Sequence, residues 1–198
     1  KNDVKLDIGE SGGELRIYVD GPFRDRFGRD RRRDYDVNYD FDLKVPAATV
    51  LQLANVNHGP VRVENTSGNF DLRSVNGGIE LVEAAGSGTA RTVNGKISAV
   101  FDRNPSSSTS FKTVNGTIEA SFRPNLSADI RVQTFNGAAY TDFEATPLPR
   151  PAAVPGERRG NRFVYRADRS TAMRIASGGP EITFKTLNGE IRIIKRGE

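Results

Sequence analysis

The chain has 198 residues, enough for one domain or one elongated array of repeats, and a chain of this length buries roughly 70% of its unfolded surface. It contains no cysteine, which excludes disulfides, thiolate nucleophiles and cysteine-based zinc or iron–sulfur sites. Its 29 Lys and Arg residues against 25 Asp and Glu give a formal net charge of +4, an interspersed pattern that predicts solubility before it predicts a polyanionic partner.

No stretch approaches the ~18 consecutive apolar residues of a membrane-spanning helix. The first residues, "KNDVKL", lack a start methionine and the apolar region of a signal peptide. We therefore read Lys1 as the first residue of a processed or trimmed chain.

Three stretches near the N-terminus alternate apolar and polar residues, which is typical of strands. They are Val4–Ile8, Glu14–Val19 and the longer Tyr35–Val45, which reads as a half-buried strand. Exposed strand edges at the ends of a stack invite aggregation. We therefore expect residues 1–45 to form an antiparallel sheet that caps the array described below.

An arginine-rich segment, "RDRFGRDRRR", lies between these strands and carries six arginines and two aspartates. One interpretation is a binding loop for phosphates or acidic polymers. The other is a solvated loop in which Arg and Asp side chains pair locally, because several aspartates dilute the charge and no set of aromatic residues accompanies it. The residues of the candidate binding loop are Arg24, Arg26, Arg29, Arg31, Arg32 and Arg33.

A unit of about 20 residues recurs from residue 46 onward, and each unit is centred on an asparagine. Apolar residues stand four and six positions before the asparagine and three and five positions after it, which predicts one strand on each side. A regular period near 20 is typical of stacked repeats that cannot bury an apolar face alone. The anchors are Asn57, Asn76, Asn94, Asn115, Asn136 and Asn188, spaced 19, 18, 21, 21 and 52 residues apart.

The Asn-Gly pair of each unit allows two interpretations. Asn-Gly between alternating strands is a strong hairpin signal, which would give an antiparallel β-hairpin meander. However, the residue before each asparagine is always apolar, which favours a corner where that residue enters the core and the asparagine amides stack as a ladder. We therefore predict an all-β, single-chain β-solenoid of about six ~20-residue coils, with the meander as the alternative. The predicted corner residues are Asn76, Gly77, Asn94, Gly95, Asn115, Gly116, Asn136, Gly137, Asn188 and Gly189.

A Pro- and Arg-rich insertion at residues 144–170 separates the coils of residues 46–143 from those of 171–198, within a single β-repeat domain of residues 1–198. Four prolines in a short span predict a loop, and "NRFVYRA" predicts an extra strand. Such insertions often carry binding surfaces, and a tolerated insertion is the alternative.

Residues for catalysis are sparse. The one histidine, His58, stands in a turn without cysteine or a carboxylate cluster beside it. No Gly-rich phosphate loop occurs, and the outward residues four positions after each asparagine are chemically mixed. We therefore predict no catalytic residue, no cofactor site and no metal site, and expect that the protein is not an enzyme.

The sequence "KVP" at residues 44–46, followed by "SVNGGI", "TVNGKI", "TVNGTI" and "TLNGEI", resembles a bacterial β-strand-repeat family of unknown function whose members are labelled as adhesins. The resemblance implies a β-solenoid that is secreted, periplasmic or on the cell surface, and it supplies no catalytic residue. We expect a non-enzymatic cell-envelope module for binding, adhesion or scaffolding. Its partner would be an envelope polysaccharide, an anionic lipid or another envelope protein, with nucleic acid disfavoured. The alternative is a carbohydrate-active enzyme on a β-helical scaffold, which requires two carboxylates in one groove.

Overall fold

The computed structural model describes residues 5–20, 39–56, 59–149, 157–159, 162–164 and 170–197. It divides the chain into two compact units, Lys1–Leu43 and Lys44–Glu198. The secondary structure of the described residues consists of strands, so the predicted all-β class is confirmed. None of the described segments forms a helix with the length and apolar character needed to cross a membrane.

The first unit contains an antiparallel hairpin of β1 (Lys5–Ser11) and β2 (Glu14–Asp20). The predicted strand Tyr35–Val45 is wrong where it is described, because residues 39–45 form no strand and are exposed. Alternation of apolar and polar residues allows a segment to be half-buried, but a strand also needs a hydrogen-bonded neighbour. No described residue forms a strand pair with residues 39–45. That the N-terminal strands cap the repeats stays a prediction.

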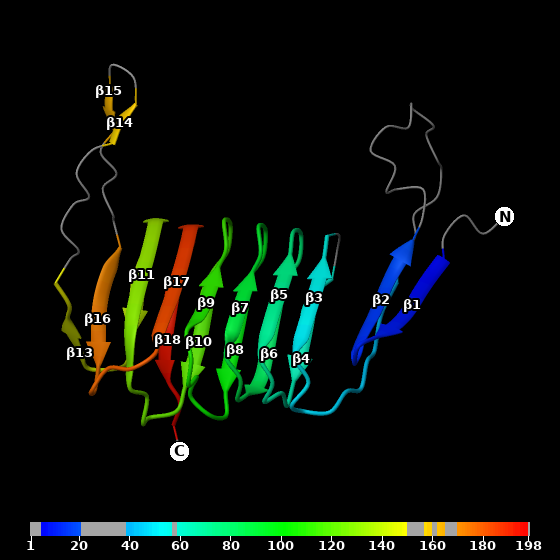
Figure 1. The fold of residues 1–198 in the computed structure, drawn as a ribbon. Helices are drawn as coiled ribbons and strands as arrows, with labels where there is room; N and C mark the ends of the chain where they lie inside the picture. The colour runs from blue at the N-terminus through cyan, green and yellow to red at the C-terminus, as the bar shows by residue number, and fades with distance from the viewer. Residues whose placement is uncertain are drawn as a thin grey trace. The chain divides into compact units, whose positions relative to one another are not determined.

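The second unit consists of two larger sheets and a short hairpin (Figure 1). The hairpin pairs β14 (Glu157–Arg159) with β15 (Arg162–Val164), so the extra strand predicted in "NRFVYRA" is confirmed. In spatial order, the eight-stranded sheet contains β13 (Ala145–Pro147), β16 (Thr171–Ile175), β11 (Ala128–Asn136), β17 (Glu181–Asn188), β9 (Thr109–Lys112), β7 (Gly88–Arg91), β5 (Phe70–Ser74) and β3 (Leu51–Asn55). The six-stranded sheet contains β12 (Ala139–Thr141), β18 (Ile191–Lys195), β10 (Ile118–Phe122), β8 (Ile97–Phe101), β6 (Ile79–Ala84) and β4 (Val61–Glu64).

The predicted β-solenoid is wrong. The strands of the repeat units pair only within two separate sheets, which do not close into a solenoid, and the eight-stranded sheet is mixed because β16 pairs antiparallel to both β11 and β13. The spatial order also departs from the chain order. The last unit, β17 and β18, lies between the unit of β9 and β10 and the unit of β11 and β12 (Figure 1).

The alternative of an antiparallel meander is also wrong. The two strands that flank each Asn-Gly pair belong to different sheets, and each pairs in parallel with the equivalent strand of the neighbouring unit. The Asn-Gly pair is therefore where the chain crosses from one sheet to the other.

The hydrophobic core lies between the two sheets, where the apolar residues of the alternating strands meet. Its largest members are four fully buried phenylalanines. Phe101 stacks on Phe122 with ring centroids 5.0 Å apart, and Phe111 stacks on Phe184 at 5.3 Å. Edge-to-face contacts join the two pairs across the core. Because Phe184 belongs to β17, this cluster fixes the last unit of the sequence in the middle of the stack.

The residues before each asparagine point outward, contrary to the prediction that they enter the core. Their exposed fractions run from 37% to 62%, at Val56, Val75, Val93, Val114, Phe135 and Leu187. Strand alternation continues to the position two before each asparagine, and that position is the last one directed inward. It holds a buried Ser or Thr in most units, at Ser74, Thr92, Thr113 and Thr186.

The threonine hydroxyls tie neighbouring units together. Thr113 Oγ1 donates to the Gly95 carbonyl at 3.1 Å, and Thr92 makes the equivalent bond to the Gly77 carbonyl at 2.8 Å. A Cβ at Gly116 would lie 2.0 Å from the Gly95 carbonyl oxygen. Glycine is therefore required here by the close approach of two backbones.

Candidate ligand-binding surface

The residues predicted from the sequence fall into two groups. The candidate loop at residues 24–33 lies outside the described residues, as does His58. The Asn-Gly residues form a column along the crossing between the sheets, in which Asn94, Asn115, Asn188 and Asn136 each donate an amide hydrogen bond to the asparagine of a neighbouring unit. These bonds are 2.7 to 3.0 Å long, and the column stabilises the fold.

A row of four basic side chains crosses the outward face of the eight-stranded sheet, at the position three residues before each asparagine. We call it the basic row, and it consists of Arg73 on β5, Arg91 on β7, Lys112 on β9 and Lys185 on β17. Each residue is in register with the next one, and all four are exposed. Adjacent strands lie ~4.8 Å apart, so the backbone positions of the row span about 14 Å.

One carboxylate partly neutralises the basic row. Asp71 accepts hydrogen bonds from Arg73 Nε at 3.2 Å and Nη2 at 2.5 Å, and Arg91 Nη2 lies 3.6 Å from Asp71 Oδ1. The hydrogen bonds from Arg73 are the main reason why the pKa of Asp71 lies below its ordinary value.

At the β9 and β17 end of the row, no described carboxylate neutralises the basic side chains. Lys112 and Lys185 make no ion pair within the part of the chain that the structure describes. Their backbones are direct partners in the β9–β17 ladder. Like charges at neighbouring positions of a sheet repel each other, and an anion bound against this pair would relieve that repulsion.

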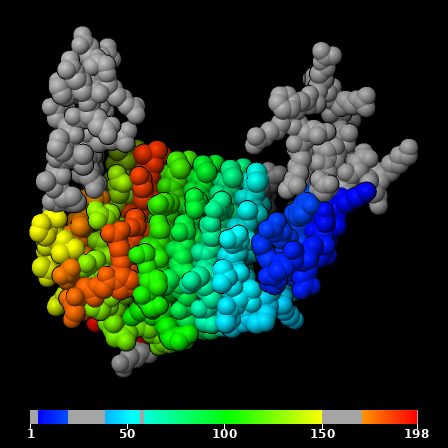
Figure 2. All heavy atoms as spheres, viewed as in Figure 1, coloured from blue at the N-terminus to red at the C-terminus, as the bar shows by residue number. Residues whose placement is uncertain are grey.

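Hydroxyl residues stand beside the basic row on β7, β9 and β17, two residues earlier on each of these strands. They are Thr89, Ser110 and Thr183, which are also in register. The residues at these two outward positions of β5, β7, β9 and β17 include no aromatic side chain. Figure 2 shows the repeat units as adjacent coloured stripes, with the red stripe of the last unit beside the green ones. Ser110 Oγ is buried, and Thr183 Oγ1 donates to Glu181 Oε1 at 3.2 Å, so the surface combines a line of cations with the half-buried hydroxyls of Thr89 and Thr183.

The sequence reasoning missed the basic row. The sequence contains a signal for the row, because the residue three positions before the asparagine is basic in four units. In chain order Gln133 separates Lys112 from Lys185. The row becomes continuous only because β17 pairs with β9. This pairing places Lys185 beside Lys112, and Gln133 lies on the other side of Lys185.

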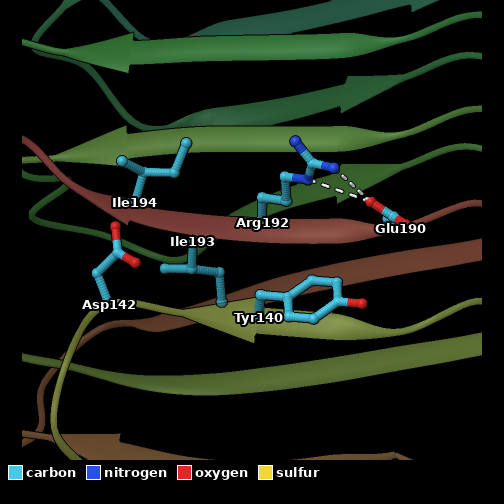
Figure 3. Close-up of a pocket in the computed structure, with 6 residues that line it drawn as sticks. All are labelled: Tyr140, Asp142, Glu190, Arg192, Ile193 and Ile194. Atoms are coloured by element: carbon cyan, nitrogen blue, oxygen red, sulfur yellow. Dashed lines mark hydrogen bonds and ion pairs between the residues drawn. The ribbon is translucent and has the colours of Figure 1, made fainter.

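A shallow hollow of about 260 Å³ lies on the other sheet, between β12 and β18 (Figure 3). Arg192 Nε and Nη2 donate to Glu190 Oε2 at 3.1 and 2.7 Å, and these bonds are the main reason why the pKa of Arg192 is raised. Asp142 Oδ2 accepts a hydrogen bond from the Lys195 backbone at 3.2 Å. Figure 3 shows Asp142 and Glu190 at opposite ends of the hollow, with Tyr140 beside Arg192.

Within the described ranges, no group of three or more His, Cys, Asp or Glu side chains is placed to hold a metal ion. Comparison with protein-family models, with curated proteins and with solved structures finds no match to this chain. The resemblance to the adhesin-labelled family therefore stays a prediction.

Proposed function

We propose that this protein is a non-enzymatic binding module that presents an exposed sheet face to an anionic ligand. The observation that supports the proposal is the basic row. Its lysines repel each other in the free protein, and a bound anion would relieve that repulsion. The threonine bonds and the asparagine column hold the strands in register, so the backbone positions of the row need no rearrangement before binding.

We place this module in the bacterial cell envelope, as a secreted, periplasmic or cell-surface protein. This part of the proposal is supported by the resemblance of the repeats alone. Adhesion and scaffolding are the roles that fit it, because a rigid face with a repeated set of side chains can hold a polymer or a surface at several points.

The test is a binding screen with the purified full chain. The panel contains peptidoglycan fragments, an acidic polysaccharide, a neutral polysaccharide and vesicles with anionic lipid, at about 0.05 M and about 0.5 M salt. We expect binding to at least one anionic member, weaker at the higher salt concentration. Absence of binding to every anionic member at the lower salt concentration would overturn the proposal.

A second candidate is a carbohydrate-active enzyme, because Asp142 and Glu190 line one hollow (Figure 3). Glycoside hydrolysis needs one protonated and one ionised carboxyl group across the scissile bond. Glu190 instead accepts two hydrogen bonds from the Arg192 guanidinium, so its side chain is held against Arg192 and not against a sugar. We expect no release of reducing sugar from envelope polysaccharides. Turnover that disappears in both Asp142→Asn and Glu190→Gln would favour the enzyme instead.

A further inference from the structure

We propose that the basic row binds a linear acidic polysaccharide that carries one carboxylate per sugar, with the polymer lying across the strands from β5 to β17. This inference rests on the proposed function and names the ligand class for that surface.

The spacing of the row supports a polymer of this kind. Neighbouring cations belong to neighbouring strands, so their backbone positions recur every ~4.8 Å. One sugar of an extended 1→4-linked chain is about as long as one such interval. A polyuronate can therefore place one sugar over each strand, and its carboxylates, which lie on alternate sides of the polymer axis, come within reach of the long side chains of Arg73, Arg91, Lys112 and Lys185.

The charge of the row supports the same ligand. Asp71 already forms an ion pair with Arg73, whereas Lys112 and Lys185 have no acidic partner among the described residues. A carboxylate placed between the two lysines would gain two attractive contacts and remove one repulsive contact. We therefore assign most of the binding to the lysine pair, with Arg91 contributing next.

The uncharged groups beside the row separate this ligand from other polyanions. The half-buried Thr89 and Thr183 lie beside the cations, and their hydroxyls suit a ligand whose carboxylates alternate with sugar hydroxyls. Single-stranded nucleic acid is bound through aromatic side chains that stack on bases, and the outward positions of these strands have none. The row is also one residue wide, which suits a single polymer chain better than a membrane surface.

The experiment measures binding of a labelled tetragalacturonate to the full chain by fluorescence anisotropy. The test variant is Lys112→Gln with Lys185→Gln, and the control variant is Lys5→Gln with Arg103→Gln. Both variants lose two positive charges from exposed residues, so they have the same net charge. Circular dichroism and thermal unfolding verify that both are folded.

We expect the test variant to lose about tenfold in affinity and the control variant to stay within about twofold. The dependence of log K on log salt concentration should become shallower in the test variant and stay the same in the control variant. Affinity should also rise with oligomer length up to the tetramer, because four sugars match the four cations.

Four results would overturn the inference. Equal losses in the two variants would show that net charge alone acts, and unchanged binding in the test variant would place the polymer elsewhere; both leave the proposed function standing. Preference for a single-stranded oligonucleotide or anionic vesicles, lost in the test variant, would keep the row as a binding surface but reject the polysaccharide. No binding of any anion would reject the inference and the proposed function together.

Discussion

Replacing Thr113 by valine removes one hydroxyl from the interior without leaving a cavity, because the two side chains have nearly the same shape. Thr113 is 5% exposed, and its Oγ1 donates to the Gly95 carbonyl of the neighbouring unit at 3.1 Å. A typical hydrogen bond contributes a net 0.5–1.5 kcal/mol, and a buried acceptor left without its partner costs roughly 1–3 kcal/mol. We therefore expect the Thr113→Val variant to be destabilised by about 1–3 kcal/mol.

The adjacent residue provides a matched control. Val114 is 37% exposed and points outward, so Val114→Thr should change the free energy of unfolding by about 0.5 kcal/mol or less. Urea unfolding, followed by circular dichroism, compares the two variants with the wild-type protein. A larger loss for Val114→Thr than for Thr113→Val would refute the assignment of the inward and outward positions.

Other substitutions test the packing and the charges. Gly116→Ala places a Cβ 2.0 Å from the Gly95 carbonyl oxygen, so we expect a loss of about 2–4 kcal/mol in urea unfolding. Phe184→Ala removes a fully buried ring from the phenylalanine cluster and should cost about 3–5 kcal/mol in the same assay. Hydrogen bonds from Arg174 hold the pKa of Asp129 below its ordinary value. A lowered carboxyl pKa stabilises the fold above the unfolded pKa of about 3.9, and this contribution is lost as the pH falls through the folded pKa. Asp129→Asn should therefore flatten the loss of stability below about pH 4, measured as the urea midpoint against pH.

These predictions have their own controls. A Cβ at Gly9 would meet nothing within 4 Å, so Gly9→Ala should leave stability unchanged. If Gly116→Ala were equally neutral, the close approach of the glycine backbones would be incorrect. A mild effect of Phe184→Ala would mean that β17 does not lie in the middle of the stack. An unchanged pH profile in Asp129→Asn would show that the exposed pair with Arg174 contributes nothing measurable.

The sequence allowed the strands themselves to be predicted, because alternation around each asparagine is a local signal. Leu72 and Ile79 stand at the predicted inward positions on either side of Asn76, and both are fully buried. The prediction that the residue before each asparagine enters the core was wrong for a physical reason. An apolar valine such as Val75 can stay exposed at a small cost, whereas the threonine hydroxyls are buried because a carbonyl of the next unit accepts their hydrogen bond.

The order of the units could not be predicted from the repeats. All units have similar strands, so the local pattern does not show whether the last unit lies at the end of the stack or between two other units. The choice depends on contacts far apart in sequence, such as Phe184 with Phe111 and Asn188 with Asn115. The basic row depends on the same placement of β17, so the row could not be predicted from the sequence either.

The central claim is that the lysine pair of β9 and β17 is part of a binding surface. Titration of the isotope-labelled full chain with tetragalacturonate, followed by amide chemical shifts, tests where the ligand lies. We predict that the largest shifts fall on Arg91, Lys112, Lys185 and their strand neighbours. Shifts confined to the hollow of Tyr140 and Arg192, or to the arginine-rich segment at residues 24–33, would contradict the claim.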